Sequence, residues 1–285
     1  MQIYPRISKE QPIYDLTLIV DITRSMNAED YRLNGQPVSR LEYVKHCLRE
    51  LLISLPCQSK LGLGVFTERR AAILFTPIEV CSGFPEINAS IASLDWRMAW
   101  AADSRIAHGL FNTLQEMTDK NSGLIFLTDG QEAPPINPRY GPDFSSLKRQ
   151  TSGFIVGVGG LQPVTIPKFN TLGQRIGVYG PDDVPQRTSF GESDLNPEKI
   201  DGYDARNAPF GRAAPVGEEH LSALREDYLK QLATESGLGY SRLTNAGDLA
   251  RAIGASKPAR TTKQFEDIRK YYAACIIVLL LAQLI

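Results

Sequence analysis

The sequence predicts an α/β protein in three layers, with a mostly parallel central sheet and helices on both faces. Two short runs, residues 16–20 and 124–127, have the composition of buried strands, and the first of them consists of β-branched and aliphatic residues. Each run leads into an acidic residue, Asp21 in the first case and Asp129 in the second. Helical patterns alternate with further strand-like runs, which is typical of parallel sheets with crossover helices. Ligands of such sheets bind beyond the carboxyl ends of the strands, where both acids are expected.

The remaining elements follow from the spacing of apolar residues. Ser39 is a candidate N-cap for a helix with a 3.6-residue apolar period that ends at Pro56. Residues 61–67 and 71–75 are expected to pair as antiparallel strands, which gives the sheet one antiparallel edge. Further helices are expected over residues 85–94, 106–117, 221–235 and 248–253, and further strands over residues 154–158 and 239–243.

The chain is expected to form one domain over residues 14–254, preceded by an extension at residues 1–13. Residues 161–216 are rich in Pro, Gly, Asp and Asn and lack a periodic pattern, so we expect an irregular insertion there. Residues 255–270 are interpreted as a basic juxtamembrane linker before an apolar helical segment at residues 271–285.

The C-terminal segment is interpreted as a tail anchor in the inner (cytoplasmic) membrane. As a helix it would measure about 22 Å, less than the hydrocarbon core of about 30 Å. There are three alternatives. The natural chain continues further, the segment packs on a partner protein, or the segment is a buried C-terminal helix of this domain. The basic residues before it predict that residues 1–270 lie on the cytoplasmic side, and no secretory signal is recognised at the N-terminus.

Charge and cysteine content narrow the function classes. The chain has 31 basic and 32 acidic residues, so no basic field favours nucleic acid as a partner. The four cysteines lack a CxxC spacing, which argues against structural zinc. They are expected to be free thiols, with no disulfide framework.

Residues 21–25 (DITRS) offer one carboxylate and two hydroxyls from a single loop. These are hard oxygen donors, which Mg²⁺, Mn²⁺ and Ca²⁺ prefer. The segment resembles the DxSxS motif of von Willebrand factor A (vWA) domains, with Thr23 in the place of the middle Ser. Residues 128–130 resemble the third metal-site segment of that family, and residues 103–110 resemble its middle loop.

The resemblance implies a Rossmann-like vWA fold and a metal-ion-dependent adhesion site (MIDAS) that holds Mg²⁺, with Mn²⁺ or Ca²⁺ as alternatives. A carboxylate of a protein partner would complete the coordination of the ion. The middle loop departs from the family pattern, because Ala102 and Asp103 stand where two glycines are usual. Asp103 is therefore a possible competitor of the serine that follows it. The ligands carried over from the family are Asp21, Thr23, Ser25, Ser104 and Asp129.

Other candidate functional residues have weaker sequence signals than the proposed metal ligands. Trp96 and Trp100 flank the middle loop, either as an exposed recognition patch or as wedges that hold the loop on the sheet. The glycines of residues 157–160 are interpreted as a turn, since no phosphate-binding Lys-Ser/Thr pair follows. His46, His108 and His220 are interpreted as surface or packing residues.

The wider pattern resembles bacterial vWA proteins that work with MoxR-type AAA+ ATPases. Residues 157–168 and 220–225 are most similar to the Mxa-type accessory proteins of methanol oxidation clusters. That resemblance implies a non-enzymatic adaptor in the maturation, by calcium insertion, of a PQQ-dependent methanol dehydrogenase. The alternatives are a chelatase-type vWA subunit and a metal-dependent hydrolase or phosphotransferase with Asp21 as nucleophile. Such an enzyme usually requires a nearby second Asp and a Lys, which residues 22–24 do not supply.

Overall fold

The computed structural model describes most of the chain. The described residues are 6–101, 103–117, 122–133, 141–148, 152–184, 218, 220–255, 259–267, 269 and 272–273.

A six-stranded sheet forms the centre of the molecule, with the strand order β13-β8-β7-β2-β5-β6. All neighbouring strands pair in parallel except β6, which runs antiparallel to β5 at the edge of the sheet. The predicted α/β fold with one antiparallel edge strand is therefore confirmed. The strands are β2 (Asp15–Asp21), β5 (Lys60–Thr67), β6 (Arg70–Glu79), β7 (Gly123–Thr128), β8 (Gly153–Gly157) and β13 (Gly239–Arg242).

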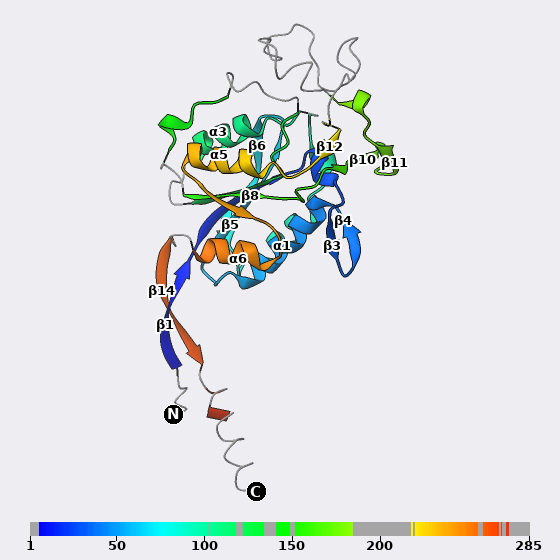
Figure 1. Cartoon of the computed structure of the whole chain (residues 1–285). Coiled ribbons are helices and arrows are strands. Elements are labelled where there is room, and N and C mark those ends of the chain that lie inside the picture. The colour runs from blue at the N-terminus through cyan, green and yellow to red at the C-terminus, as the bar shows by residue number, and fades with distance from the viewer. Residues whose placement is uncertain are drawn as a thin grey trace.

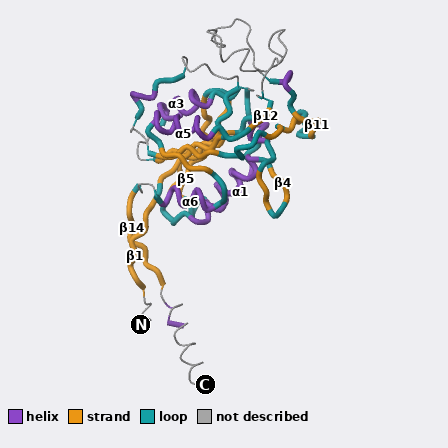
Figure 2. Tube along the Cα trace, in the orientation of Figure 1, coloured by secondary structure: helices purple, strands orange, loops and turns teal. Residues whose placement is uncertain are grey.

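Helices cover both faces of this sheet, as Figures 1 and 2 show. On one face α1 (Arg40–Ser54), α2 (Phe84–Ser93) and α6 (Gly247–Gly254) share a buried apolar cluster with β2, β5 and β7. On the other face α3 (Ile106–Glu116) and α5 (Glu226–Ser236) form a second cluster with the sheet. Both faces of β2 are therefore buried, which explains its run of aliphatic and β-branched residues.

Helix α1 begins and ends where the sequence predicts. The Ser39 side chain accepts a hydrogen bond from the Glu42 amide at 3.2 Å, which caps the first turn. The helix ends at Ser54, two residues before Pro56. The other short elements of the chain include η1 (Arg24–Asn27), η2 (Trp96–Met98), η4 (Phe144–Ser146) and the β3–β4 hairpin (Tyr31–Leu33 and Gln36–Val38).

The prediction of a helix over residues 221–235 is wrong at its start. Helix α5 begins at Glu226, and the preceding residues form the short strand β12 (Leu221–Ser222). Strand β12 pairs with β9 (Val164–Thr165), far away in the sequence. This pairing overrides the helical spacing of Leu221 and Leu224, because a local period contains no information about a distant strand.

The segment predicted to be irregular contains regular structure in its first part. After β9 come β10 (Pro167–Phe169) and β11 (Arg175–Val178), which pair antiparallel, and then η5 (Pro181–Asp183). The prediction of an irregular segment is thus wrong for residues 164–183. Residues 185–217 lie outside the described part of the chain.

The two ends of the described chain form a ribbon. Strand β1 (Arg6–Ile13) pairs antiparallel with β14 (Arg260–Asp267), and the ribbon extends away from the sheet (Figures 1 and 2). The sequence predicts an extension and a linker at these positions, because a local pattern contains no information about pairing between the two ends of a chain. No helix within the described residues is long and apolar enough to cross a membrane. The predicted anchor at residues 271–285 lies outside the described residues except for positions 272–273.

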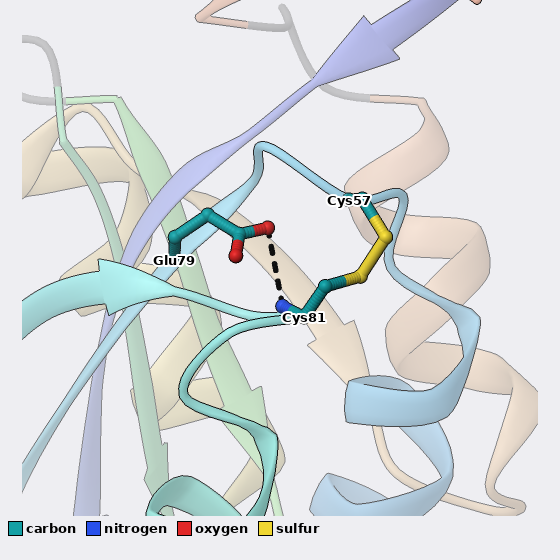
Figure 3. Close-up of side chains that lie close together, drawn as sticks. All are labelled: Cys57, Glu79 and Cys81. Carbon is teal, nitrogen blue, oxygen red and sulfur yellow. Dashed lines mark hydrogen bonds between the residues drawn. A yellow bond between two sulfur atoms is a disulfide. The ribbon is translucent and has the colours of Figure 1, made fainter.

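Two of the four cysteines form a disulfide, so the expectation of free thiols is wrong for them. Cys57 lies just after α1 and Cys81 just after β6, and Figure 3 shows the bond between them. The carboxylate of Glu79 accepts hydrogen bonds from the amides of Gln58, Cys81 and Ser82, which holds the same two loops together. Cys47 is free and buried, as predicted.

Candidate functional site

Asp21 is the last residue of β2 and is fully buried. Its Oδ1 accepts hydrogen bonds from the Thr23 amide at 2.8 Å and the Thr23 hydroxyl at 2.6 Å. Its Oδ2 accepts a hydrogen bond from the Thr128 hydroxyl at 2.6 Å. Burial, and then the negative charge of Asp129, raise the pKa of the Asp21 carboxyl well above its ordinary value. The carboxylate is thus held rigidly in a place where its charge is poorly compensated.

The two hydroxyls of the DITRS loop lie beside this carboxylate. Thr23 and Ser25 are buried, and their hydroxyl oxygens are 3.4 Å apart. Ser25 lies in the single turn of η1, which directs the chain away from the end of β2. The structure therefore brings Asp21, Thr23 and Ser25 together, as the sequence predicts.

Asp129 follows β7, the strand that pairs with β2, and is also fully buried. Its Oδ1 accepts a hydrogen bond from the Gln131 amide at 3.0 Å. Its Oδ2 is 2.7 Å from Arg40 Nη1 and 3.1 Å from the Ser222 hydroxyl. Gly130 has a φ of +81°, and a Cβ at this position would approach Arg225 and Leu229 to 3.0 Å. The turn after Asp129 therefore requires glycine.

Ser104 lies in the loop before α3, with its backbone paired to two neighbouring loops. It bridges Glu68, which follows β5, and Ala133, which follows the β7 turn. The Ser104 amide donates to the Ala133 carbonyl at 2.7 Å, and the reverse bond measures 2.8 Å. The Ser104 side chain is buried, and its hydroxyl oxygen has no hydrogen-bond partner in the described part of the chain. A buried hydroxyl without a partner is costly and calls for an explanation.

These donors fit a divalent cation. Two carboxylates and three hydroxyls, at the ends of neighbouring strands, form a set of oxygen donors, the type that Mg²⁺ prefers. The unpartnered Ser104 oxygen and the mutual repulsion of Asp21 and Asp129 are both features that a cation would relieve. The residues that would hold it are Asp21, Thr23, Ser25, Ser104 and Asp129, and the ion would supply an electrophilic centre for an anionic group.

The weaker candidates surround this set. The Asp103 carbonyl accepts from the Glu68 amide, and its side chain lies 4.0 Å from Arg105. Trp96 stacks on Phe169 with ring centroids 5.6 Å apart. Both tryptophans, Trp96 and Trp100, are half-buried and pack on the core, an arrangement that favours the wedge interpretation over the exposed patch.

Glu132 supports the Ser104 loop, although no local sequence pattern indicates this role. Its carboxylate accepts hydrogen bonds from the Ile106 and Ala107 amides, both at 3.0 Å, and from the Tyr228 hydroxyl. It therefore caps the first turn of α3, the helix that follows Ser104. Burial raises the pKa of the Glu132 carboxyl to about 7, although these hydrogen bonds oppose the shift.

Three further residues contact the predicted ligands. Thr128 belongs to the segment that resembles the third metal-site segment, but the resemblance alone does not predict its contact with Asp21. That contact follows from its place before Asp129 on a buried strand that lies beside β2. Arg40 and Ser222 gave no signal, since both reach Asp129 from positions far away in the chain.

Comparisons with known proteins agree with this fold. Residues 16–131 match the family model of the von Willebrand factor type A domain. The chain therefore has the Rossmann-like vWA fold, with the match lying over residues 16–131. No curated protein matches it.

Two solved structures resemble the chain over most of their length. One is an aerotolerance-related membrane protein from Bacteroides fragilis NCTC 9343 with multiple mutations to serines, at 16% identity and a TM-score of 0.53. That match covers 85% of this chain and 96% of the other. The second is the conserved hypothetical protein BatB from Bacteroides thetaiotaomicron, at 18% identity and a TM-score of 0.54, with 84% and 95% covered. At these identities the likeness shows the fold alone.

Proposed function

We propose that this chain is a protein-binding module whose recognition element is a divalent metal ion, Mg²⁺ by preference. The observation that carries the proposal is the buried, unpartnered Ser104 hydroxyl. It belongs to the same group of loops, beyond the carboxyl ends of the strands, as Asp21 and Asp129. A carboxylate of a partner protein would complete the coordination of the ion. The proposed role is recognition, so the chain itself need not catalyse a reaction.

Calorimetry with MgCl₂ on the full chain in detergent tests the ion site. The wild type should bind one Mg²⁺, and the Asp21→Ala variant should lose this binding while it keeps the native circular dichroism spectrum. Asp143→Ala is the matched control, because Asp143 only caps η4 and is remote in sequence from the DITRS loop. Equal Mg²⁺ binding by the wild type and Asp21→Ala would contradict the site.

The rival function is hydrolysis or transfer of a phosphate with Asp21 as nucleophile. Both oxygens of Asp21 already accept hydrogen bonds from Thr23 and Thr128, which argues for a fixed ligand. Turnover of p-nitrophenyl phosphate that requires Asp21 would overturn the binding role in favour of catalysis.

We further propose that the partner belongs to an assembly system with a MoxR-type AAA+ ATPase. The resemblance of residues 157–168 and 220–225 to Mxa-type accessory proteins supports the narrower proposal of methanol dehydrogenase maturation. Two structural neighbours are described as an aerotolerance-related membrane protein and as BatB. They support the alternative that the assembly system acts on a protein other than methanol dehydrogenase. A pull-down with Mg²⁺ and with EDTA, read by mass spectrometry, separates these proposals. Recovery of the ATPase without a methanol dehydrogenase would contradict only the narrower one.

Membrane attachment is part of the proposal, and the side of the membrane is open to a direct test. The basic residues before position 271 predict the cytoplasmic side, whereas disulfides such as Cys57–Cys81 usually persist in oxidising compartments. We propose that the disulfide is the better guide and that the domain faces an oxidising compartment. The AAA+ ATPase of the same assembly system would then act from the opposite side of the membrane, where ATP is present. After brief treatment with a reductant, a membrane-impermeant maleimide should label these cysteines in intact spheroplasts. Labelling only after lysis would favour the cytoplasmic side.

A further inference from the structure

Arg40 is a fully buried arginine whose guanidinium joins two acids beside the proposed ion site. Its Nη1 lies 2.7 Å from Asp129 Oδ2. Its Nε and Nη2 lie 3.0 Å and 2.7 Å from Asp30 Oδ2. It also donates to the hydroxyl and the carbonyl of Ser222, at 2.5 and 3.2 Å. With carboxylates and a hydroxyl on several sides, the guanidinium is fixed in one geometry.

The surrounding backbone leaves room for this one side chain. Gly159 has a φ of +120°, and a Cβ there would lie 2.8 Å from Cζ of Arg40. The next residue, Gly160, donates its amide hydrogen to Asp30 Oδ2 at 2.8 Å. The loop after β8 is therefore shaped around the Arg40–Asp30 pair, which argues against a chance contact.

Arg40 changes what Asp129 can offer to an ion. Both oxygens of Asp129 already have donors, Gln131 on one side and Arg40 with Ser222 on the other. The positive charge at 2.7 Å offsets most of the attraction that this carboxylate would exert on a second cation. Among the described residues Asp21 has no such cationic partner, and its hydrogen-bond donors are the neutral Thr23 and Thr128.

We propose that Arg40 is a built-in cation that tunes the ion site by neutralising Asp129. This inference rests on the proposed function, and it specifies how the site is regulated. Mg²⁺ then binds mainly through Asp21 and the hydroxyls, with lower affinity than two free carboxylates would give. The bound ion keeps more of its positive charge, which favours an acidic segment of a protein partner as the final ligand.

Two substitutions with opposite expected effects test the proposal, each measured by calorimetry with MgCl₂ on the full chain in detergent. Arg40→Met removes the charge and should tighten Mg²⁺ binding by at least about tenfold. Asp30→Asn removes one of the two acids that pair with Arg40. The guanidinium charge then acts more strongly on Asp129 and on the ion, so Mg²⁺ binding should weaken. Arg175→Met is the control, since Arg175 is an exposed arginine paired with Glu29, and it should leave the affinity unchanged.

Thermal unfolding supplies a second readout in case Arg40→Met is unstable without the ion. Saturating MgCl₂ should raise the Tm of Arg40→Met by more than that of the wild type, because the ion replaces the lost cation. Unchanged or weaker Mg²⁺ binding in Arg40→Met, or unchanged or tighter binding in Asp30→Asn, overturns the proposal. Loss of binding in Asp21→Ala together with either of those results would leave the proposed function standing and reject the role of Arg40 alone.

Discussion

The hydroxyl of Thr128 donates a hydrogen bond of 2.6 Å to Oδ2 of Asp21, across the pair of strands β7 and β2. The same hydroxyl accepts a hydrogen bond from the Gly130 amide at 3.1 Å. Thr128 therefore connects the two acid-bearing loops of the proposed ion site. It fixes the orientation of the Asp21 carboxylate while it supports the turn that carries Asp129.

Replacement of Thr128 by Val should affect stability and Mg²⁺ binding together. The lost hydrogen bond leaves a buried carboxylate oxygen without its donor, which costs about 1–3 kcal/mol of unfolding free energy. Mg²⁺ affinity should fall, because the carboxylate is no longer held in one orientation. Urea unfolding and calorimetry measure the two effects.

The chain offers a matched control at the other end of the same strand pair. The hydroxyls of Thr17 and Ser122 lie 3.0 Å apart, and both residues are buried. Thr17→Val should lower the unfolding free energy while Mg²⁺ affinity stays at the wild-type value. Equal losses of Mg²⁺ affinity in both variants would mean that Thr128 acts only through general stability.

Glu132 should give the protein a pH dependence near neutrality. The pKa of its carboxyl is raised to about 7 in the folded state, from an ordinary value of 4.5. Between these two values the folded protein keeps a proton that the unfolded chain releases, so the unfolding free energy falls as the pH rises. Glu132→Gln should flatten this slope between about pH 5 and 7. Urea unfolding at several pH values checks it.

Tyr228→Phe is the companion variant for this measurement. The hydrogen bond from the Tyr228 hydroxyl lowers the pKa of Glu132, so its removal should raise that pKa further and extend the slope to higher pH. A slope that stays the same in Glu132→Gln would assign the effect to a different group.

Glu79 should produce the opposite dependence in acid. The amides of Ser82, Gln58 and Cys81 lower the pKa of its carboxyl to about 2. Its contribution to stability is therefore complete above the ordinary value of 4.5 and is lost as the pH falls toward 2. Glu79→Gln should reduce the unfolding free energy at pH 7 and narrow the gap to the wild type at pH 3. Glu50→Gln, on an exposed position of α1, should match the wild type at both pH values.

The Cys57–Cys81 disulfide should stabilise the domain against unfolding. The two cysteines are 24 residues apart in the sequence, and closure of a loop of this size is worth about 3 kcal/mol. Reduction with dithiothreitol should lower the Tm of the wild type. The Cys57→Ser/Cys81→Ser double variant should begin at that lower Tm and show no response to the reductant. A response in the double variant would point to another thiol.

Much of the fold could be predicted because its signals are local. The apolar run of β2 and the Ser39 cap of α1 are both read within a few residues, and both elements form where expected. The same holds for Asp21, Thr23 and Ser25, which share one loop. Leu221 shows the limit of local patterns. Its spacing predicts a helix, but it lies in β12, which pairs with the distant strand β9.

By itself the sequence determined the strand that ends at Asp21, the oxygen donors around it and the alternation of strands and helices. The tertiary structure alone decided which distant groups meet there. Arg40 reaches Asp129 across 89 positions of sequence, and β1 pairs with β14 from the opposite end of the described chain. Local patterns report the preference of a segment for helix or strand and for a buried or exposed face. The charge at the proposed site depends on which side chains are brought together, and that is set only when the strands assemble into one sheet.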